Sequence, residues 1–287
     1  MFRNIFRQAY TLTIHNPLLW LFGLVLLGGF NLSLVNFSAL IPNSEWKTWG
    51  LPISVFKSAD FSTIIIVLIA VVVSFLILHF IKISFIVVAH NLIHKTNQHT
   101  CQLCVNVEQK SLPYFLWWPR MVATSLITVA LTAGVSIIVN TLLNQVDQNR
   151  PAAIAINLVF LIIVTCVIGT WNAFAGYFIV LHGMNFKSAV TASFDLLVMH
   201  FQQVIEFVVT LSIIYTLSVV IGNAFISGYQ HGFDSGIFVQ VRLLFLIAFV
   251  VWFAVNNTFF NLAFLLFFDR IVKSTPVAEV KPLPHLS

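Results

Sequence analysis

Charged side chains are scarce in this sequence. Asp, Glu, Lys and Arg make up 8% of the 287 residues, whereas the hydrophobic types make up 59%. A soluble domain carries roughly 25% charged residues, because its surface must be hydrated. Nine carboxylates and fourteen Lys and Arg side chains cannot cover a globule of this length. This scarcity excludes a water-soluble globular domain and favours lipid as the natural solvent, in agreement with a mean hydropathy of +0.97.

Cysteines and catalytic motifs are also few. Three cysteines cannot form a disulfide framework. The sequence contains no HExxH, GxSxG, P-loop or GxGxxG motif. No two carboxylates lie together in an apolar run, and no polar stretch is long enough for a phosphodiesterase domain. We therefore expect a protein that is not an enzyme and that binds no cofactor. The net charge of +5 is spread too thinly for nucleic acid, but it suits anionic lipid headgroups.

Long apolar runs dominate what is present. A helix needs about 20 apolar residues to cross roughly 30 Å of hydrocarbon. Six stretches qualify, at 17–39, 61–83, 121–143, 152–180, 203–226 and 238–268. They predict an all-α fold, a polytopic transmembrane helical bundle of about six spans, as one integral membrane domain over residues 1–287. The first run exceeds the 7–15 apolar residues of a signal peptide, so we expect it to be retained.

The distribution of Lys and Arg predicts the orientation. Ten of the fourteen fall on the side that holds both termini, and four fall on the other side. Basic residues near the ends of spans favour the cytoplasmic side. We therefore expect a multi-pass protein of the cytoplasmic (inner) membrane, with both termini in the cytoplasm.

Short amphipathic segments precede the first, third and fifth spans. In the last of these, Asn185 is placed as an N-cap. At helical spacing, one face of this segment carries Phe186, Ala189, Val190, Ser193, Phe194, Leu197 and Phe201. The first copy begins at Phe2, and the second, around Glu108–Trp118, is interrupted by Pro113. These segments favour three repeats, each of one interfacial helix and two spans. The alternative is that cytoplasmic loops of membrane proteins are commonly amphipathic.

Two short motifs carry a family resemblance. The run FAGYFIVLHGMNFKSAVTASFDLL starts at Phe174, and HNPLLWLFG starts at His15. They resemble motifs of uncharacterised prokaryotic six-span membrane proteins, which are similar to the membrane domain that accompanies some glycerophosphoryl diester phosphodiesterases. His182 departs from the acidic residue that is more common in that family. The resemblance implies a six-span membrane domain with no established catalytic role.

The segment after the second span is the best candidate for a metal site. His90 and His94 would share a helix face at a spacing of four residues. Cys101 and Cys104 have the C-x-x-C spacing that lets two thiolates bind one Zn²⁺, with His94 or His99 as further ligands. The alternative is a polar loop whose cysteines have no such role, because no second ligand pair follows at the usual distance.

Ionisable and amide groups inside the spans are the second candidate. A charge within lipid often marks a transport pathway, and Glu206 lies about one turn into the fifth span. Lys82 or His79 is its expected partner. Further polar residues in the inner half of the sixth span are Asn256, Asn257 and Asn261. They could line a polar route or hydrogen-bond between helices, and packing is the favoured interpretation.

Three functions follow from these patterns. The first is a non-enzymatic membrane protein that acts through contacts with membrane lipids or other membrane proteins. The second is a small transporter or channel that uses Glu206 and the asparagines of the sixth span. The third is a metal or redox sensor at the cytoplasmic face.

Overall fold

A computed structural model describes residues 2–25, 61–97, 114–145, 151–234 and 239–274. Within these ranges the chain forms α-helices and no strand, so the all-α prediction is confirmed. The helices are α1 (Phe2–His15), α2 (Leu18–Val25), α4 (Phe61–Asn97), α5 (Tyr114–Gln145), α6 (Pro151–His182), α7 (Phe186–Met199), α8 (Phe201–Asp234) and α9 (Val239–Ser274).

In the part of the chain that the structure describes, three helices are long and apolar enough to cross a membrane. These stretches are Val72–His94 in α4, Phe201–Tyr229 in α8 and Leu243–Ser274 in α9. A shorter apolar stretch, Val167–His182, lies in α6. The membrane class is therefore supported by the described helices. The count of six spans and the threefold repeat stay predictions.

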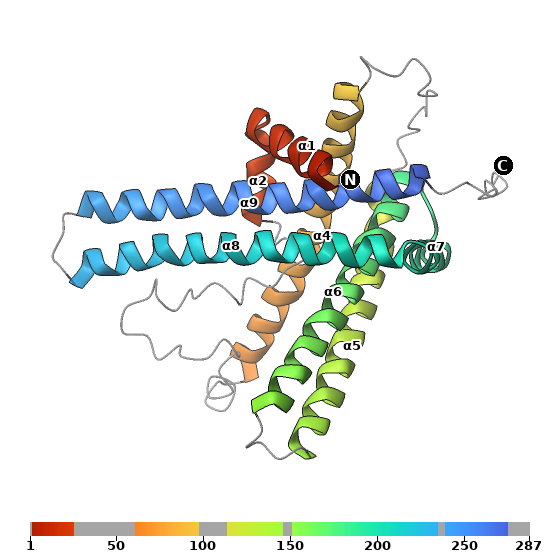
Figure 1. The fold of residues 1–287 in the computed structure, drawn as a ribbon, viewed down its shortest axis with the longest axis horizontal. Helices are drawn as coiled ribbons and strands as arrows, with labels where there is room; N and C mark the ends of the chain where they lie inside the picture. Colours follow the sequence, from red (N-terminus) through yellow and green to blue (C-terminus); the bar gives the residue numbers. More distant parts are fainter. Residues whose placement is uncertain (1, 26–60, 98–113, 146–150, 235–238, 275–287) are drawn as a thin grey trace.

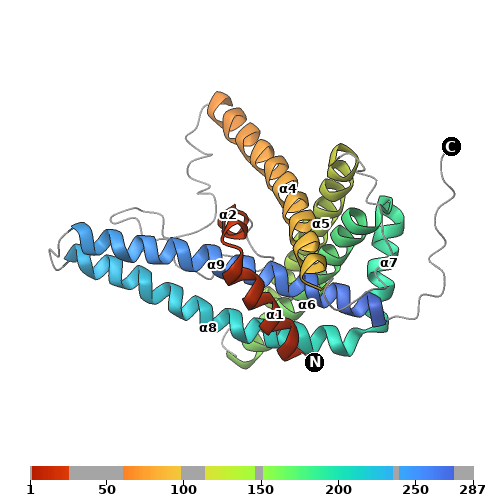
Figure 2. The same ribbon diagram turned by 90° about the horizontal axis from the view of Figure 1, so that it is seen from above.

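The long helices point in different directions and meet at one end. Helices α8 and α9 form one antiparallel hairpin, α5 and α6 form a second, and α4 runs alone (Figures 1 and 2). They meet at the C-terminal halves of α4, α6 and α9 and the N-terminal halves of α5 and α8, where α1, α2 and α7 also pack. We call this region the helix junction. Away from it the two hairpins and α4 diverge.

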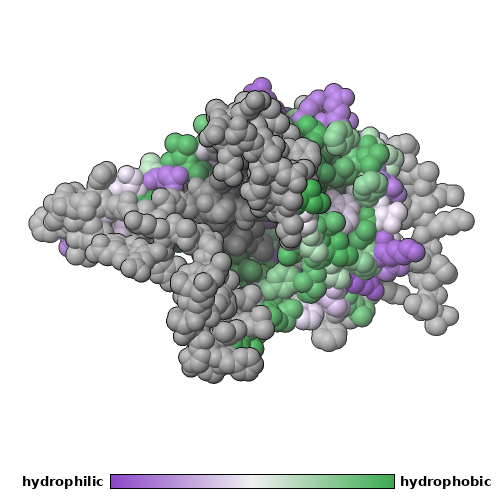
Figure 3. Space-filling view, turned by 90° about the horizontal axis from the view of Figure 1, so that it is seen from below, coloured by the Kyte–Doolittle hydropathy of each residue, from purple (hydrophilic) through white to green (hydrophobic). Residues whose placement is uncertain are grey.

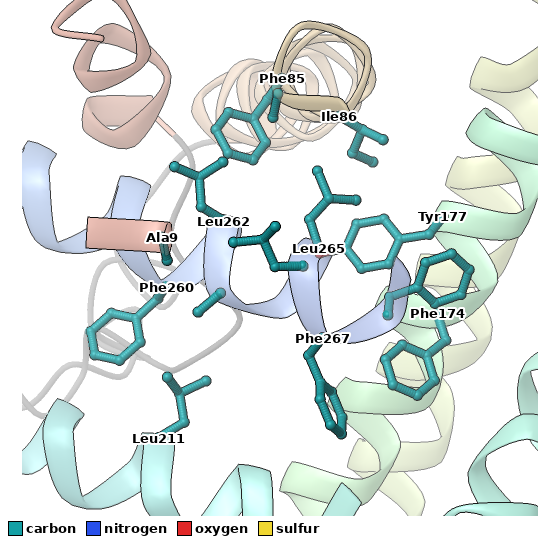
Figure 4. Close-up of a cluster of buried hydrophobic side chains, with 14 of the residues drawn as sticks. Ala9, Phe85, Ile86, Phe174, Tyr177, Leu211, Phe260, Leu262, Leu265 and Phe267 are labelled. Carbon is teal, nitrogen blue, oxygen red and sulfur yellow. The ribbon is translucent and has the colours of Figure 1, made fainter. Parts of the chain in front are cut away.

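Aromatic and aliphatic side chains pack together in the helix junction (Figure 4). Phe207 of α8 stacks on Phe267 of α9 with ring centroids 3.9 Å apart. Phe6 of α1 stacks on Phe207 at 5.8 Å, and Phe2 meets Phe267 edge-on at 6.0 Å. Phe174 of α6 lies 6.3 Å from Phe267. Offset and edge-on aromatic pairs add to the packing of buried rings, so this cluster links α1, α6, α8 and α9.

Apolar side chains remain open along the diverging helices. Figure 3 shows apolar residues over much of the described surface of one face. The exposed large hydrophobic residues away from the junction include Ile69, Ile77, Phe80, Leu126, Val129, Ile138, Ile213, Leu217, Val220, Leu244 and Ile247. A single exposed leucine is common in soluble proteins, but long apolar faces are not. These faces suit contact with acyl chains.

Helix α1 buries one of its faces against the protein. Ile5 and Ala9 are buried, whereas Arg3 and Arg7 are exposed. The buried face packs on α9, and its phenylalanines reach α8. The helix therefore contributes its apolar residues to the junction.

Only part of the apolar face that the sequence predicts for helix α7 is buried. Ala189, Ser193 and Leu197 are buried against the protein, but Phe194 and Phe201 are exposed. Because one residue separates α7 from α8, and α7 runs crosswise to α8 (Figures 1 and 2), only part of the face can turn inward. The second predicted interfacial segment is described only from residue 114, where its residues form the continuous start of α5.

Candidate functional site

The connection between α6 and α7 is a defined joint. Gly183 has φ = 65°, a left-handed conformation that glycine adopts without a Cβ clash. The Met184 N–H donates to the Phe178 carbonyl at 3.3 Å. The Arg120 guanidinium of α5 donates to the carbonyls of Gly183 (3.3 Å) and Met184 (3.0 Å). Arg120 therefore places a positive charge at the C-terminus of α6, where the helix dipole favours a cation.

The N-terminus of α7 completes this joint. The Asn185 side chain accepts from the Ser188 N–H at 2.8 Å, which confirms the predicted N-cap. The Trp171 indole of α6 donates to the Val190 carbonyl at 3.3 Å. Ala189 is fully buried, and its small side chain lets α7 lie close to α6. The longer of the two resemblance motifs is therefore a structural joint.

The shorter motif also forms a packing contact. Gly23 of α2 lies so close to α9 that an added Cβ would stand 2.1 Å from the Ala254 oxygen and 2.4 Å from Thr258 Oγ1. Asn257 Nδ2 donates to the Gly23 carbonyl at 3.1 Å, and Thr258 Oγ1 donates to the Leu19 carbonyl at 3.0 Å. Small residues and interhelical hydrogen bonds are the usual means of close helix packing in membranes.

A cluster of ionisable residues lies where α4, α6 and α9 end. We call His90, His94, His182, Asp269 and Lys273 the histidine cluster. The rings of His90 and His94 lie 4.2 Å apart, and Lys273 forms a 2.6 Å ion pair with Asp269. His94, His182, Asp269 and Lys273 are the ionisable neighbours of His90. The cluster therefore brings imidazoles, a carboxylate and an ammonium into one neighbourhood.

The cluster offers proton-binding groups, but no metal centre is found in the described part of the chain. No group of three or more His, Cys, Asp or Glu side chains is arranged there to hold a metal. His90 Nδ1 is buried without a hydrogen-bond partner. Of the predicted metal ligands, His94 belongs to the histidine cluster. His99, Cys101 and Cys104 lie outside the described residues, so that hypothesis is untested.

The predicted transport residues do not form one group through their hydrogen bonds. Glu206 is exposed and accepts from its own-helix neighbour Gln202 at 3.0 Å. Asn257 is buried in the contact with α2, and Asn261 donates to the Asn257 carbonyl at 2.8 Å. Asn256 is partly buried. These bonds favour the packing interpretation for Asn257 and Asn261.

His79, one of the two expected partners of Glu206, is bonded elsewhere. Its Nδ1 lies 2.7 Å from the Phe75 carbonyl and its Nε2 lies 2.7 Å from Ser125 Oγ of α5. A carbonyl only accepts, so Nδ1 carries the proton, and Nε2 of the neutral ring accepts from Ser125. The Trp118 indole of α5 donates to the Leu76 carbonyl at 3.1 Å. These two bonds hold α4 and α5 together beside Lys82.

No local sequence motif indicates the histidine cluster as a whole. Its members come from three helices that are far apart in the sequence. The sequence signal for this cluster is the predicted orientation of the spans. In the predicted orientation, the second, fourth and sixth spans all end on the cytoplasmic side, so His90, His182 and Asp269 are expected on one side. Their convergence on one neighbourhood requires the packing of the helices.

These helices and contacts define the class of protein. Within the described residues the protein is all-helical, three helices are capable of crossing a membrane, and several polar side chains bond one helix to another. Comparison with models of known protein families, with curated proteins and with solved structures finds no match. The resemblance to the six-span family therefore stays a prediction.

Proposed function

We propose that this chain is a non-enzymatic integral membrane protein that acts through contacts with lipids or with other membrane proteins. The observation that carries the proposal is the arrangement of the long helices. They pack at one end, diverge beyond it and leave apolar faces open. A sealed channel would require the reverse, with helices closed around a polar path along their length.

Several described contacts support a structural use of the polar residues. Thr258 and Asn257 bond to backbone carbonyls of α2, and Arg120 bonds to carbonyls of the α6–α7 joint. His79 bonds to Ser125 across the α4–α5 contact. Side chains that already satisfy partners in this way are less available for transfer of a substrate.

The proposed location is the cytoplasmic membrane, with both termini in the cytoplasm. The helix ends that are predicted to face the cytoplasm are the ends that meet at the helix junction. Arg120, Arg270 and Lys273 lie at these ends. Their positive charge supports a junction that faces the anionic inner leaflet.

Photocrosslinking from the diverging helices tests the proposed function. A benzophenone amino acid replaces Leu217, which is 62% exposed on α8, and a matched variant carries it at Leu211, which is fully buried on the same helix. We expect adducts of Leu217 with phospholipid or with a membrane protein, and adducts of Leu211 within its own chain. The choice between lipid and protein adducts identifies the partner. If the Leu217 position reacts with neither, the proposal is wrong.

A further inference from the structure

The exposed side of α1 carries a row of side chains that changes from basic to apolar along the helix. Arg3, Arg7, Tyr10 and Ile14 follow one another at spacings of four, three and four residues. At 100° per residue they fall within about 60° of one another. All four are exposed, Tyr10 at 61% and Ile14 at 41%. The row lies roughly opposite the face of α1 that packs on α9.

Exposed apolar side chains follow directly in α2. Leu18 is 77% exposed and Leu21 is 63% exposed, whereas Leu19 between them is buried. We call the exposed residues of the two helices the basic-to-apolar stripe, which consists of Arg3, Arg7, Tyr10, Ile14, Leu18 and Leu21.

The charge of the stripe has one sign. No Asp or Glu occurs in the sequence before Glu45, so α1 and α2 carry no carboxylate. Arg3 and Arg7 are four residues apart, which places their Cβ atoms about 5–6 Å from each other on the helix surface. Glu206 of α8 precedes Phe207, a neighbour of α1, but its carboxylate accepts a hydrogen bond from Gln202 on its own helix. Two exposed guanidinium groups can therefore reach one anion together.

Contacts with α9 give the relative depth of the two ends of the stripe. The ring of Phe2, next to Arg3, lies 6.0 Å from the ring of Phe267. At the other end, Gly23 lies against Ala254. Residues 267 and 254 are 13 positions apart, which is about 20 Å along a helix. Helices α1 and α2 therefore lead from the charged C-terminal end of α9 toward its middle (Figures 1 and 2).

The same contacts relate the stripe to the membrane. Helix α9 has no charged residue from 243 to 268, 26 residues in all. This run is about 39 Å long and exceeds the roughly 30 Å of hydrocarbon. With the hydrocarbon centred on the run, Phe267 lies in the headgroup region and Ala254 lies near the middle of the membrane. Arg3 is then at the level of the headgroups, and Leu21 is among the acyl chains.

An anionic phospholipid matches this order of side chains. Guanidinium groups bind phosphate through paired hydrogen bonds, and basic residues are attracted to the anionic cytoplasmic leaflet. A tyrosine ring is favoured at the boundary between headgroups and hydrocarbon, which is where Tyr10 stands between Arg7 and Ile14. An acidic soluble protein can reach the arginines, but it cannot reach Leu21. The stripe as a whole therefore favours a lipid.

We propose that the basic-to-apolar stripe binds an anionic phospholipid. Arg3 and Arg7 hold the phosphate group, and Ile14, Leu18 and Leu21 contact the acyl chains. The site deepens the proposed function, on which it rests, because it names the class of lipid and the surface that selects it.

Photocrosslinking from Tyr10 tests the proposed site. The full chain, with a benzophenone amino acid at this exposed position, is reconstituted in vesicles of equal parts phosphatidylglycerol and phosphatidylcholine. The matched probe is at Leu217, which is 62% exposed on α8. Mass spectrometry counts the adducts of each lipid, and their ratio is compared with the composition of the vesicle.

We expect an excess of phosphatidylglycerol adducts at Tyr10 and the ratio of the vesicle at Leu217. Arg3→Gln and Arg7→Gln should each lower the excess by about fivefold, because each removes one basic residue from the anionic surface. The double variant should show the ratio of the vesicle. Replacing both arginines with lysine should keep most of the excess, and Lys187→Gln, which removes an exposed charge on α7, should keep all of it.

The outcomes separate this site from the proposed function. An equal ratio at Tyr10 and Leu217, or an excess that survives in the double glutamine variant, overturns the site. A protein adduct as the main product at Tyr10 also overturns it, because the stripe then contacts a partner protein. Adducts at Leu217 do not depend on the arginines. Their persistence in the double variant shows that the helices remain inserted, so a lost preference at Tyr10 with lipid adducts intact concerns the arginines alone, whereas the absence of any adduct at Leu217 refutes the proposed function.

Discussion

The contact between Gly23 and α9 leads to the sharpest prediction about stability. A Cβ at position 23 would stand 2.1 Å from the Ala254 oxygen, and ordinary contacts require more than 3.0 Å. Gly23→Ala therefore forces α2 and α9 apart by about 1 Å, because a packed interface has no spare volume. The obstacle is a backbone atom, so no change of side-chain rotamer relieves it.

The same displacement breaks two hydrogen bonds. The bonds from Asn257 to the Gly23 carbonyl and from Thr258 to the Leu19 carbonyl measure 3.1 and 3.0 Å, and an extra 1 Å ends both. Interhelical hydrogen bonds in membranes contribute about 0.6–2 kcal/mol each. We therefore expect Gly23→Ala to lower the free energy of unfolding by about 1–4 kcal/mol.

Unfolding by added sodium dodecyl sulfate, followed by circular dichroism in mixed micelles, measures this loss. Gly134→Ala and Gly169→Ala are the matched controls, because nothing lies within 4 Å of a Cβ at either position. Both lie inside helices, so alanine should stabilise them by up to about 1 kcal/mol. Adding Thr258→Ala should not restore the stability of Gly23→Ala, because the Ala254 oxygen would still clash with the new Cβ. If Gly23→Ala behaves like the controls, α2 does not pack on α9 as described.

Three further predictions concern the α6–α7 joint and α8. Arg120→Met should destabilise the protein by about 1–3 kcal/mol, because it removes the charged hydrogen bonds to the Gly183 and Met184 carbonyls. Thermal unfolding measures this loss. The control Arg7→Met changes an exposed residue and should have little effect on the unfolding temperature. Asn185→Ala should cost about 1 kcal/mol and speed amide exchange in the first turn of α7, whereas Asn185→Asp should preserve the cap. Glu206→Gln should change the free energy of unfolding by less than about 0.5 kcal/mol, because its carboxylate is exposed. A loss of ion flux in reconstituted vesicles of Glu206→Gln would instead favour the transporter alternative.

Local features of the fold were accessible from the sequence. Lipid requires backbone groups to bond within their own segment, so long apolar runs predict helices directly. The Asn185 cap depends on four consecutive residues. These predictions depend on neighbours in the chain, and the structure confirms them.

Contacts between distant segments were not accessible. Asn257 and Gly23 are 234 residues apart, and nothing in either local sequence indicates the other. The apolar face of α7 was predicted as one surface, because helical spacing cannot show that Ala189 packs on α6 while Phe194 stays open. The directions in which the hairpins diverge depend on how residues such as Phe207 and Phe267 interlock, which periodicity does not record.

Some residues of the candidate site were also predictable from the sequence, and others were not. The sequence indicated His90 and His94 from their spacing, and their rings do meet. His182 and Asp269 join them only because α6 and α9 end beside α4. Lys82 was expected to pair with Glu206, but Glu206 accepts a hydrogen bond from Gln202 on its own helix.

The central place of α9 has a consequence for the order in which the chain assembles. This helix contacts α1, α2, α4, α6 and α8, yet it is the last of the described helices to be synthesised. Helices α1 and α2 therefore remain without their main partner until translation passes residue 274. Closing a loop of this length carries an entropic penalty, and incomplete intermediates expose surfaces that chaperones and proteases recognise. Assembly of the junction is therefore a late event, and truncation within α9 should leave the earlier helices inserted but unassembled.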